Sequence, residues 1–360
     1  MHIVDISIER YDLDLTEPYT IMYETVYNAT NFVLKIRTDS DEITGYGCAA
    51  PDSFVTGETP FDVEQSYYNH IYPALQGADP FHFTEIISNL KAIKSINSSA
   101  LAMVDMALFD LVSKFANVPL YKYLGAYRNS IPTSITISIM PFDEMMKKAA
   151  EFIEKGFFIF KIKGGLDWEE DVYKLKSLRE KYPAIALRFD ANQGYSLDDS
   201  LKFASKAESL KLEIFEQPMP INQENQYTAL SQYIPQDVMA DESLKTLKDS
   251  FRLASNGLVN MLNIKLMKVG GIQEGMHINS VAKSAGYDVM IGCLDECQLG
   301  ISAGLHFALS RPNIIYADLD SFLDFEKDPY QDLIILKKGI LYPNQNPGLG
   351  ISGQNKSFYY

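Results

Sequence analysis

The sequence predicts an α/β protein in which a barrel of parallel strands follows a smaller α+β domain. From residue 131 onward, apolar strand-like runs alternate with helix-like segments, and this alternation is typical of a parallel sheet. Eight such runs within about 190 residues indicate a closed barrel. The competing doubly wound open sheet is disfavoured because no Gly-x-Gly-x-x-Gly pattern follows the first of these strands.

The first part of the chain, residues 1–125, is expected to form the α+β domain. Alternating or β-branched residues predict antiparallel strands at Ile3–Tyr11, Thr30–Arg37 and Ile43–Cys48, and loops at Leu15–Asn28 and Pro51–Pro60. A cap followed by proline starts a helix at Thr59-Pro60, and apolar periodicity predicts further helices at Pro80–Ile93 and Ser98–Ala116.

The barrel is expected over residues 126–322. Its strands are predicted at Ile131–Met140, Phe157–Lys163, Ala184–Asp190, Leu212–Glu216, Val238–Asp241, Val259–Lys265, Tyr287–Cys293 and Asn313–Asp318. The intervening helices are predicted at Phe142–Lys155, Asp167–Tyr182, Ser196–Leu210, Asn222–Tyr233, Leu244–Ala254, Ile272–Ala285 and Leu299–Ser310. The remaining segment, residues 323–360, should carry short strands and return to the first domain.

Composition narrows the partners that the protein can have. A net charge of -15 argues against nucleic acid and against anionic membranes. Three scattered cysteines are too few for a disulfide scaffold, lack the paired histidines of a zinc site, and favour a reducing compartment. The first ten residues alternate like a strand instead of forming a signal peptide, and no apolar run is long enough to span a membrane. We therefore expect a soluble, cytoplasmic protein with no nucleic-acid or membrane partner.

Two lysines end the second predicted strand of the barrel. Lys161 and Lys163 are separated by one residue, so their side chains should point the same way with roots roughly 6–7 Å apart. Because two like charges at this distance disfavour double protonation, one amine is expected to approach its neutral form and act as a base. The alternative is a polar strand end with two solvated lysines.

Carboxylates end the next three predicted strands. Asp190, Glu216 and Asp241 are spaced by one strand–helix unit each, so their side chains should meet at the same end of the barrel, where reactive groups of such folds gather. Three carboxylates share a site only when a cation offsets their repulsion, and oxygen ligands favour Mg²⁺. The alternative is three unrelated exposed acids.

Lys265 ends the sixth predicted strand and should lie across the metal from the lysine pair. Two bases that face each other across a divalent cation suit 1,1-proton transfer, in which one lysine removes a proton next to a carboxylate and the other returns it from the opposite face. The reaction is a racemisation or epimerisation. Lys268, three residues later, is expected to be solvated.

A second pair of acids follows the last strand. Asp318 and Asp320 alternate along the chain, so both should point toward the barrel mouth, away from the metal ligands. There they would suit the ammonium group of a substrate. The alternative is a capping aspartate beside a solvated neighbour.

These residues, in this order, resemble the muconate lactonizing enzyme subgroup of the enolase superfamily. The shared motifs are Lys161-Ile-Lys163, Asp190-Ala-Asn, Glu216-Gln-Pro, Asp241-Glu-Ser and Asn263-Ile-Lys265, and the likeness extends to Thr25-Val-Tyr27, Thr56-Gly57 and Pro347-Gly-Leu-Gly350. Asp318-Leu-Asp320 narrows the resemblance to the dipeptide epimerases, typified by L-Ala-D/L-Glu epimerase. Neither His277 nor His306 is placed for the His–Asp base of the mandelate racemase branch.

The resemblance implies a modified (β/α)₇β TIM-type barrel covered by an α+β capping domain. It implies that Asp190, Glu216 and Asp241 bind Mg²⁺ and that Lys163 and Lys265 exchange the proton, with Lys161 tuning Lys163. It further implies that Asp318 and Asp320 hold the free amino terminus of a dipeptide and that Thr136 lines the same cavity.

The chain departs from the Ala-Glu type in the first capping loop. That type has an arginine before Thr-Val-Tyr, whereas this chain has Glu24, and Asp52 and Asp295 add further negative charge nearby. Because acids repel a glutamyl side chain, we expect a dipeptide of the L-Ala-L-Xaa type whose carboxyl-terminal residue is cationic or at least not acidic, such as Ala-Lys or Ala-Arg. The alternative is a solvated Glu24 and an apolar pocket formed by Met22, Tyr23 and Phe54.

Two other functions stay open at this point. A succinylbenzoate synthase or cycloisomerase would use the same lysines and metal site but would not require Asp318 and Asp320. A barrel that binds a carboxylate without turning it over would not require opposed bases. Homo-oligomers are frequent among such barrels, and no residue decides the matter here.

Overall fold

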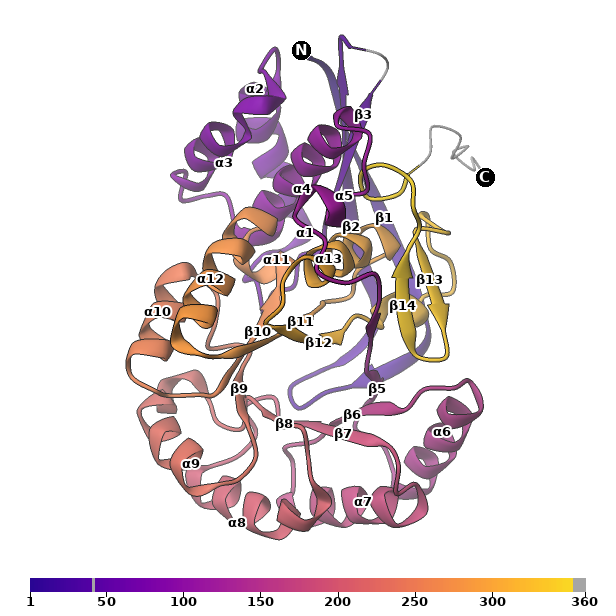
Figure 1. Cartoon of the computed structure of the whole chain (residues 1–360), viewed down its shortest axis with the longest axis vertical. Helices are drawn as coiled ribbons and strands as arrows, with labels where there is room; N and C mark the ends of the chain where they lie inside the picture. Colours follow the sequence, from indigo (N-terminus) through magenta and orange to yellow (C-terminus); the bar gives the residue numbers. More distant parts are fainter. Residues whose placement is uncertain (41–42, 352–360) are drawn as a thin grey trace.

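The computed structural model describes residues 1–40 and 43–351, and it confirms the predicted barrel and its capping domain (Figure 1). Eight parallel strands pair in the order β12-β11-β10-β9-β8-β7-β6-β5. Helices separate them along the chain, as a (β/α)₇β arrangement requires. The strands are β5 (Ile135–Ile137), β6 (Ile159–Lys163), β7 (Ala186–Asp190), β8 (Ile214–Glu216), β9 (Val238–Ala240), β10 (Met261–Lys265), β11 (Asp288–Gly292) and β12 (Ile314–Asp318).

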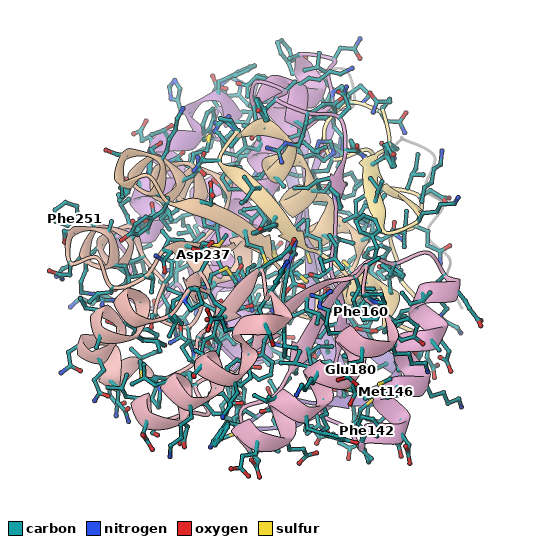
Figure 2. The ribbon with its side chains drawn as sticks, turned by 60° about the horizontal axis from the view of Figure 1, so that its bottom comes forward. Phe142, Met146, Phe160, Glu180, Asp237 and Phe251 are labelled. Atoms are coloured by element: carbon teal, nitrogen blue, oxygen red, sulfur yellow. The ribbon has the colours of Figure 1, made fainter. Side chains whose placement is uncertain are left out.

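The helices of the barrel form a ring outside the strands. They are α6 (Phe142–Glu154), α7 (Trp168–Lys181), α8 (Leu197–Ala207), α9 (Tyr227–Tyr233), α10 (Leu247–Ser255), the short α11 (Leu266–Val269), α12 (Ile272–Ala285) and α13 (Gln298–Ser310). Figure 2 shows Phe160 inside this ring and Phe251 on its outer edge, and Phe160 is fully buried whereas Phe251 is exposed. Burial of the apolar strand residues against the ring supplies most of the hydrophobic stabilisation of the barrel.

The barrel closes between its first and last strands. Thr133 bridges Ala317 in parallel, and the Ser134 amide donates to the Ala317 carbonyl at 3.1 Å. The predicted continuous strand Ile131–Met140 is therefore wrong. The chain first forms β4 (Ile131–Pro132), which pairs with β14 (Ile340–Pro343), and changes partner before β5: the Thr133 amide still donates to the Gly339 carbonyl next to β14 at 3.0 Å, whereas the Ser134 amide donates to the last barrel strand.

The capping domain packs a three-stranded antiparallel sheet on a buried helix. The sheet contains β1 (Ile3–Thr20), β2 (Thr25–Thr38) and β3 (Thr44–Ala49), and the helices are α1 (Pro60–Ser66), α2 (Tyr72–Leu75), α3 (Phe83–Lys91), α4 (Ser98–Phe115) and α5 (Leu120–Tyr123). Gly47 allows β3 to approach α4 closely, because a Cβ atom there would lie 1.9 Å from the Met103 carbonyl oxygen.

The first two strands form a long hairpin that reaches the barrel. Residues Leu15–Asn28 were expected to be a loop, which is wrong: β1 runs on to Thr20 and β2 begins at Thr25, with an irregularity in the ladder between Asp14 and Tyr19. The side-chain pattern does not indicate a strand here, because the two strands pair through backbone hydrogen bonds. At the tip, the Thr20 carbonyl accepts from the Ile139 amide of the barrel at 2.9 Å.

Asn31 of β2 joins the capping domain to the segment after β11. Its side-chain amide donates to the Asp295 carbonyl, and its side-chain oxygen accepts from the Cys297 amide, both at 2.8 Å. Cys48 lies beside this contact, with its sulfur 3.8 Å from that of Cys297 and no disulfide between them. Asn31 of the capping domain thus anchors the segment that carries Asp295.

The end of the described chain runs back across both parts. Strands β13 (Ile334–Lys337) and β14 form a hairpin, Phe325 bridges Leu15, and the Gly348 carbonyl accepts from the Leu120 amide at 2.8 Å. The last nine residues of the predicted 323–360 segment lie outside the described part. Within the part that is described, no helix has the length and apolar character to cross a membrane.

Candidate active site

A cavity of about 160 Å³ lies between the hairpin and the carboxyl ends of the barrel strands. Nine of the eleven residues expected to form the site line it, and Asp190 and Glu216 lie just beneath. The lining members are Glu24, Thr136, Lys161, Lys163, Asp241, Lys265, Asp295, Asp318 and Asp320. The strand-end positions therefore converge on one enclosed space, as the period of the strand–helix unit predicts.

The three expected metal ligands are buried on neighbouring strands. Asp190 pairs in register with Glu216, and Glu216 pairs with Met239, two residues before Asp241. One oxygen of each carboxylate is held by the protein: Asp190 Oδ1 accepts from the Asn192 amide at 2.9 Å, Glu216 Oε1 from Asn263 Nδ2 at 2.7 Å, and Asp241 Oδ1 from Lys268 Nζ at 2.6 Å.

The second oxygen of each carboxylate faces a lysine ammonium group. Asp190 Oδ2 lies 2.7 Å from Lys163 Nζ, Glu216 Oε2 lies 2.8 Å from Lys161 Nζ, and Asp241 Oδ2 lies 2.8 Å from Lys265 Nζ. Burial and the neighbouring Asp190 raise the pKa of Glu216 to about 7. This donor set fits Mg²⁺, because hydrogen bonds to one oxygen fix the orientation of each carboxylate. The other oxygen of each carboxylate already lies against a positive charge. Within residues 1–40 and 43–351 no three acids yet converge at metal-binding distance, since the Lys161 ammonium lies between two of them.

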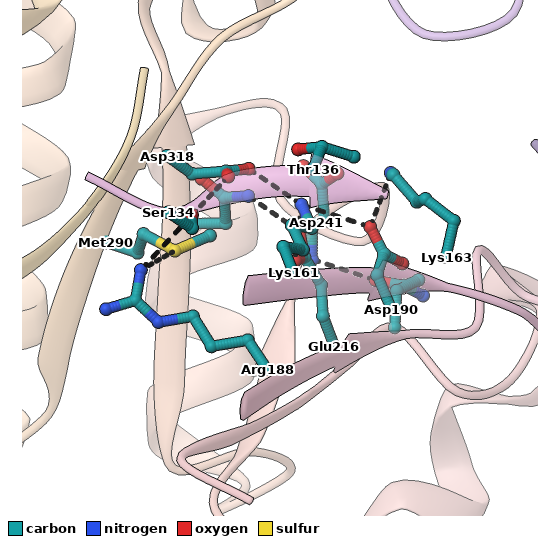
Figure 3. A network of polar contacts seen from close by, with 12 residues as sticks. Ser134, Thr136, Lys161, Lys163, Arg188, Asp190, Glu216, Asp241, Met290 and Asp318 are labelled. Carbon is teal, nitrogen blue, oxygen red and sulfur yellow. Dashed lines mark hydrogen bonds and ion pairs between the residues drawn. The ribbon is translucent and has the colours of Figure 1, made fainter. Parts of the chain in front are cut away.

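Lys161 is the central cation of this group (Figure 3). Its ammonium lies 2.8 Å from Asp318, 2.8 Å from Glu216 and 3.2 Å from Asp190, and its side chain is only 2% exposed. Burial opposes its charge, but these carboxylates outweigh burial and raise the pKa of Lys161 well above its ordinary value. The expectation that repulsion within the lysine pair would neutralise one amine is thus wrong for Lys161, because three acids meet it.

Lys163 and Lys265 stand on opposite sides of the carboxylates. Lys163 ends β6 and Lys265 ends β10, and three strands separate these two in the eight-stranded barrel. Lys163 also donates to Asn192 Oδ1 at 3.1 Å. Both side chains line the cavity, so a molecule bound there can meet an amine from either flank.

Both parts of the chain match one family of sequences. Residues 4–125 match the mandelate racemase / muconate lactonizing enzyme N-terminal domain, and residues 144–357 match the enolase C-terminal domain-like family. The chain belongs to this branch of the enolase superfamily. The resemblance inferred from the strand-end motifs is thereby confirmed.

Several members of the superfamily are similar over their whole length. The L-Lys-D/L-Arg epimerase of Desulforapulum autotrophicum is 38% identical over 98% of this chain and 99% of the relative. The substrate-liganded L-Ala-D/L-Glu epimerase of Bacillus subtilis has a TM-score of 0.94 at 32% identity, covering 98% of this chain and 99% of that one. The dipeptide epimerase of Methylococcus capsulatus, complexed with Mg and L-Arg-D-Lys, has a TM-score of 0.92 at 34% identity, covering 97% and 99%.

In this superfamily member, Lys268 was expected to be solvated, and that expectation is wrong. Its side chain is fully buried, and its ammonium donates to Asp241 Oδ1, to the Asp241 carbonyl and, at 3.0 Å, to the Asn263 carbonyl. The chain turns into α11 directly after Lys265, which brings Lys268 back under the strand ends. Asn192 and Asn263 also hydrogen-bond to site residues, namely Lys163 and Glu216. Sequence reasoning assigned them no role, although both belong to the strand-end motifs that indicated the family.

Asp318 was expected to lie away from the metal ligands, and the structure corrects this placement too. It pairs with Lys161 and accepts from the Ser134 hydroxyl, so it shares a cation with Asp190 and Glu216. Asp320 Oδ2 accepts from the Thr136 amide at 2.6 Å. Burial and the adjacent Asp318 raise the pKa of Asp320 to about 6, so it is the member of the pair that most needs a cation.

The upper wall of the cavity is acidic in this superfamily member. Tyr19 donates its hydroxyl to both oxygens of Asp295 at 2.7 Å. Burial and the charges of Asp52 and Asp295 raise the pKa of Glu24. Of the three residues proposed for an apolar alternative, Tyr23 lines the cavity; Phe54 packs on Tyr23 at 5.1 Å and is 59% exposed, and Met22 is not among the lining residues.

Proposed function

We propose that the protein is a magnesium-dependent dipeptide epimerase that moves a proton at the α-carbon of the carboxyl-terminal residue. The observation that carries the proposal is the placement of Lys163 and Lys265 on opposite sides of a buried carboxylate group. Simple binding of a ligand would not require two opposed amines. The names of the similar proteins, which are epimerases, support the same reaction class.

Asp190, Glu216 and Asp241 would hold Mg²⁺ through the oxygens that now face lysines. When bound, the ion supplies positive charge that stabilises negative charge developing on a substrate carboxylate. One lysine removes the α-proton and the other delivers a proton to the opposite face, which inverts the centre. Lys161 stays protonated and keeps Asp190 and Glu216 beside each other. Asp320, helped by Asp318, holds the amino terminus of the dipeptide.

The acidic upper wall points to a cationic carboxyl-terminal residue. Glu24, Asp52 and Asp295 line the same cavity as Lys163 and Lys265, and the charge of Asp52 acts on both of the other acids. A glutamyl side chain there would face three acids, whereas an arginine or lysine would neutralise part of the charge. The name of the L-Lys-D/L-Arg epimerase agrees with this preference.

Proton NMR in D₂O with Mg²⁺ tests the reaction and the preference together. L-Ala-L-Arg should lose its α-proton signal and gain the L,D diastereomer, with a kcat/KM at least about tenfold above those of L-Ala-L-Leu and L-Ala-L-Glu. The Lys163→Ala/Lys265→Ala double variant is the control and should show no exchange. If L-Ala-L-Glu were the best of the three, the charge argument would be wrong.

Asp320→Asn separates this proposal from the other reactions of the subgroup. Loss of the buried carboxylate should weaken binding of a free amino terminus and raise KM for every dipeptide. A succinylbenzoate synthase or cycloisomerase has no such group to hold. If the variant kept full activity on the true substrate, one of those reactions would replace epimerisation as the better assignment.

A further inference from the structure

Asp324 lines the same cavity as Asp320 and lies close enough for their charges to interact. It follows a short 3₁₀ turn, Ser321–Leu323, that begins directly after Asp320. Its carbonyl oxygen accepts from the Thr16 amide at 2.7 Å and from the Thr16 hydroxyl at 3.1 Å, which fixes this end of the turn to β1. The side chain lines the same cavity as the two catalytic lysines. Its backbone is therefore anchored, and its carboxylate faces the substrate space.

The carboxylate of Asp324 has no donor of its own. In the described part of the chain, no hydrogen bond or ion pair reaches its side-chain oxygens, whereas Asp295 on the same cavity receives the Tyr19 hydroxyl and Asp320 receives the Thr136 amide. Burial, followed by the charges of Asp320 and Asp295, raises the pKa of Asp324 to about 8. Partly buried acids in this situation are stabilised by a cation that arrives with a ligand.

The nearest cation is already engaged. Lys148 of α6 lies 2.6 Å from Glu17 of β1, and both side chains line the cavity together with Asp324. The Lys148 ammonium group is thus paired with Glu17 and acts on Asp324 only through its charge, so the Asp324 carboxylate is left without a paired cation. Eight acids and four lysines line the cavity, so the lining carries an excess of negative charge.

We propose that Asp324 binds a cationic side chain on the amino-terminal residue of the dipeptide, so that the preferred substrate carries positive charge on both residues. The inference rests on the proposed function, which puts the free ammonium group at Asp320. The side chain of that residue leaves the same carbon atom as the ammonium group. Asp324 lies four residues past Asp320 across one turn, and a lysyl or arginyl side chain is long enough to extend from the one toward the other.

The test holds the carboxyl-terminal residue fixed and varies the other. L-Lys-L-Arg and L-Nle-L-Arg have amino-terminal side chains of closely similar length, with and without a charge. The wild-type protein with Mg²⁺ should prefer the lysyl dipeptide by about tenfold in kcat/KM, through KM rather than kcat, because the contact is far from the reacting carbon. Asp324→Asn should reduce the preference to about onefold, and Asp324→Glu should retain part of it.

Asp52→Asn is the matched control, since it removes the same charge from another lining residue, one that lies near Glu24 and Asp295. It should alter the preference at the carboxyl-terminal residue and leave the Lys/Nle ratio in place. Equal effects of both variants at both positions, or a wild-type ratio near one, would overturn the assignment of Asp324. A protein that epimerises L-Ala-L-Arg without a Lys/Nle preference would fail this inference alone, whereas a protein that exchanges no α-proton from any of these dipeptides would fail the proposed function.

Discussion

The two flanks of the site each carry a pair of lysines, and the pairs differ in how they are built. On β6 the inner lysine, Lys161, precedes the outer Lys163 by two residues along one strand. On β10 the outer Lys265 comes first, and the inner Lys268 returns from α11. In both pairs the inner side chain is sealed from solvent, at 2% and 0% exposure. Both outer lysines line the cavity, and of the inner ones Lys161 lines it as well, whereas Lys268 does not.

The difference shows that a buried ammonium group can be positioned either by a residue within a strand or by a residue on the turn that follows one. Lys161 is held by carboxylates from three other strands, so its position depends on barrel closure. Lys268 is held by one carboxylate and by backbone carbonyls within the same region, so its position depends on a local turn. We therefore expect the outer lysines to serve proton transfer, Lys161 to serve stability, and Lys268 to serve metal affinity.

The largest effect should come from the outer lysines. Lys163→Ala and Lys265→Ala should each lower epimerisation by about 10³-fold or more, because each removes the amine of one face. Deuterium uptake into the separate L,L and L,D dipeptides checks this result. Each variant should still exchange the proton of one diastereomer, and the two variants should spare opposite ones. If both spared the same one, the lysines would not flank the substrate.

The inner lysine of β6 should matter next. Lys161→Met leaves Asp190, Glu216 and Asp318 without their shared cation, which should lower the free energy of unfolding in urea by about 3–5 kcal/mol without Mg²⁺. Added Mg²⁺ should recover part of the loss, since it binds only the folded form. Lys148→Met, at the pair with the exposed Glu17, is the control and should cost less than about 1 kcal/mol. Equal losses at the two sites would contradict the comparison.

The inner lysine of β10 should act on the metal. Lys268→Met frees Asp241 Oδ1, so titration calorimetry should show Mg²⁺ affinity about 10–100-fold weaker, with a smaller change in stability than for Lys161→Met. Lys268→Arg keeps the charge but not the compact geometry, so its Mg²⁺ affinity should lie between those of the wild type and Lys268→Met. Unaltered Mg²⁺ affinity in Lys268→Met would show that Lys268 does no more than fill space.

The smallest effect should come from the support of an outer lysine. Asn192→Ala removes the acceptor 3.1 Å from Lys163 Nζ and should lower kcat by about threefold to tenfold. Asn263→Ala, which frees Glu216 instead, should weaken Mg²⁺ binding more than it lowers kcat at saturating metal. Kinetics at two Mg²⁺ concentrations distinguish the two variants. Identical responses would contradict separate roles for Asn192 in proton transfer and Asn263 in metal binding.

The sequence predicted the barrel and the placement of the strand-end residues because both depend on a regular repeat of strand and helix. Asp190, Glu216 and Asp241 could be found from their period alone. Lys268 could not, since its burial depends on a turn that no local pattern marks and on the carboxylate of Asp241, which follows the neighbouring strand β9. The strand at 15–20 was missed for a related reason: its pairing uses backbone groups, and its side chains are those of a loop.

The joint that Asn31 makes between β2 and the segment after β11 has a consequence for engineering. Glu24 and Asp295 sit on different parts of the fold, yet one amide side chain couples their supports. A chimera that transplants only the hairpin tip from a relative would keep this joint and change one wall of the cavity. A crossover placed beyond residue 31 would replace Asn31 as well. The segment that carries Asp295 would then lose its support unless the matching segment of the relative were transplanted too.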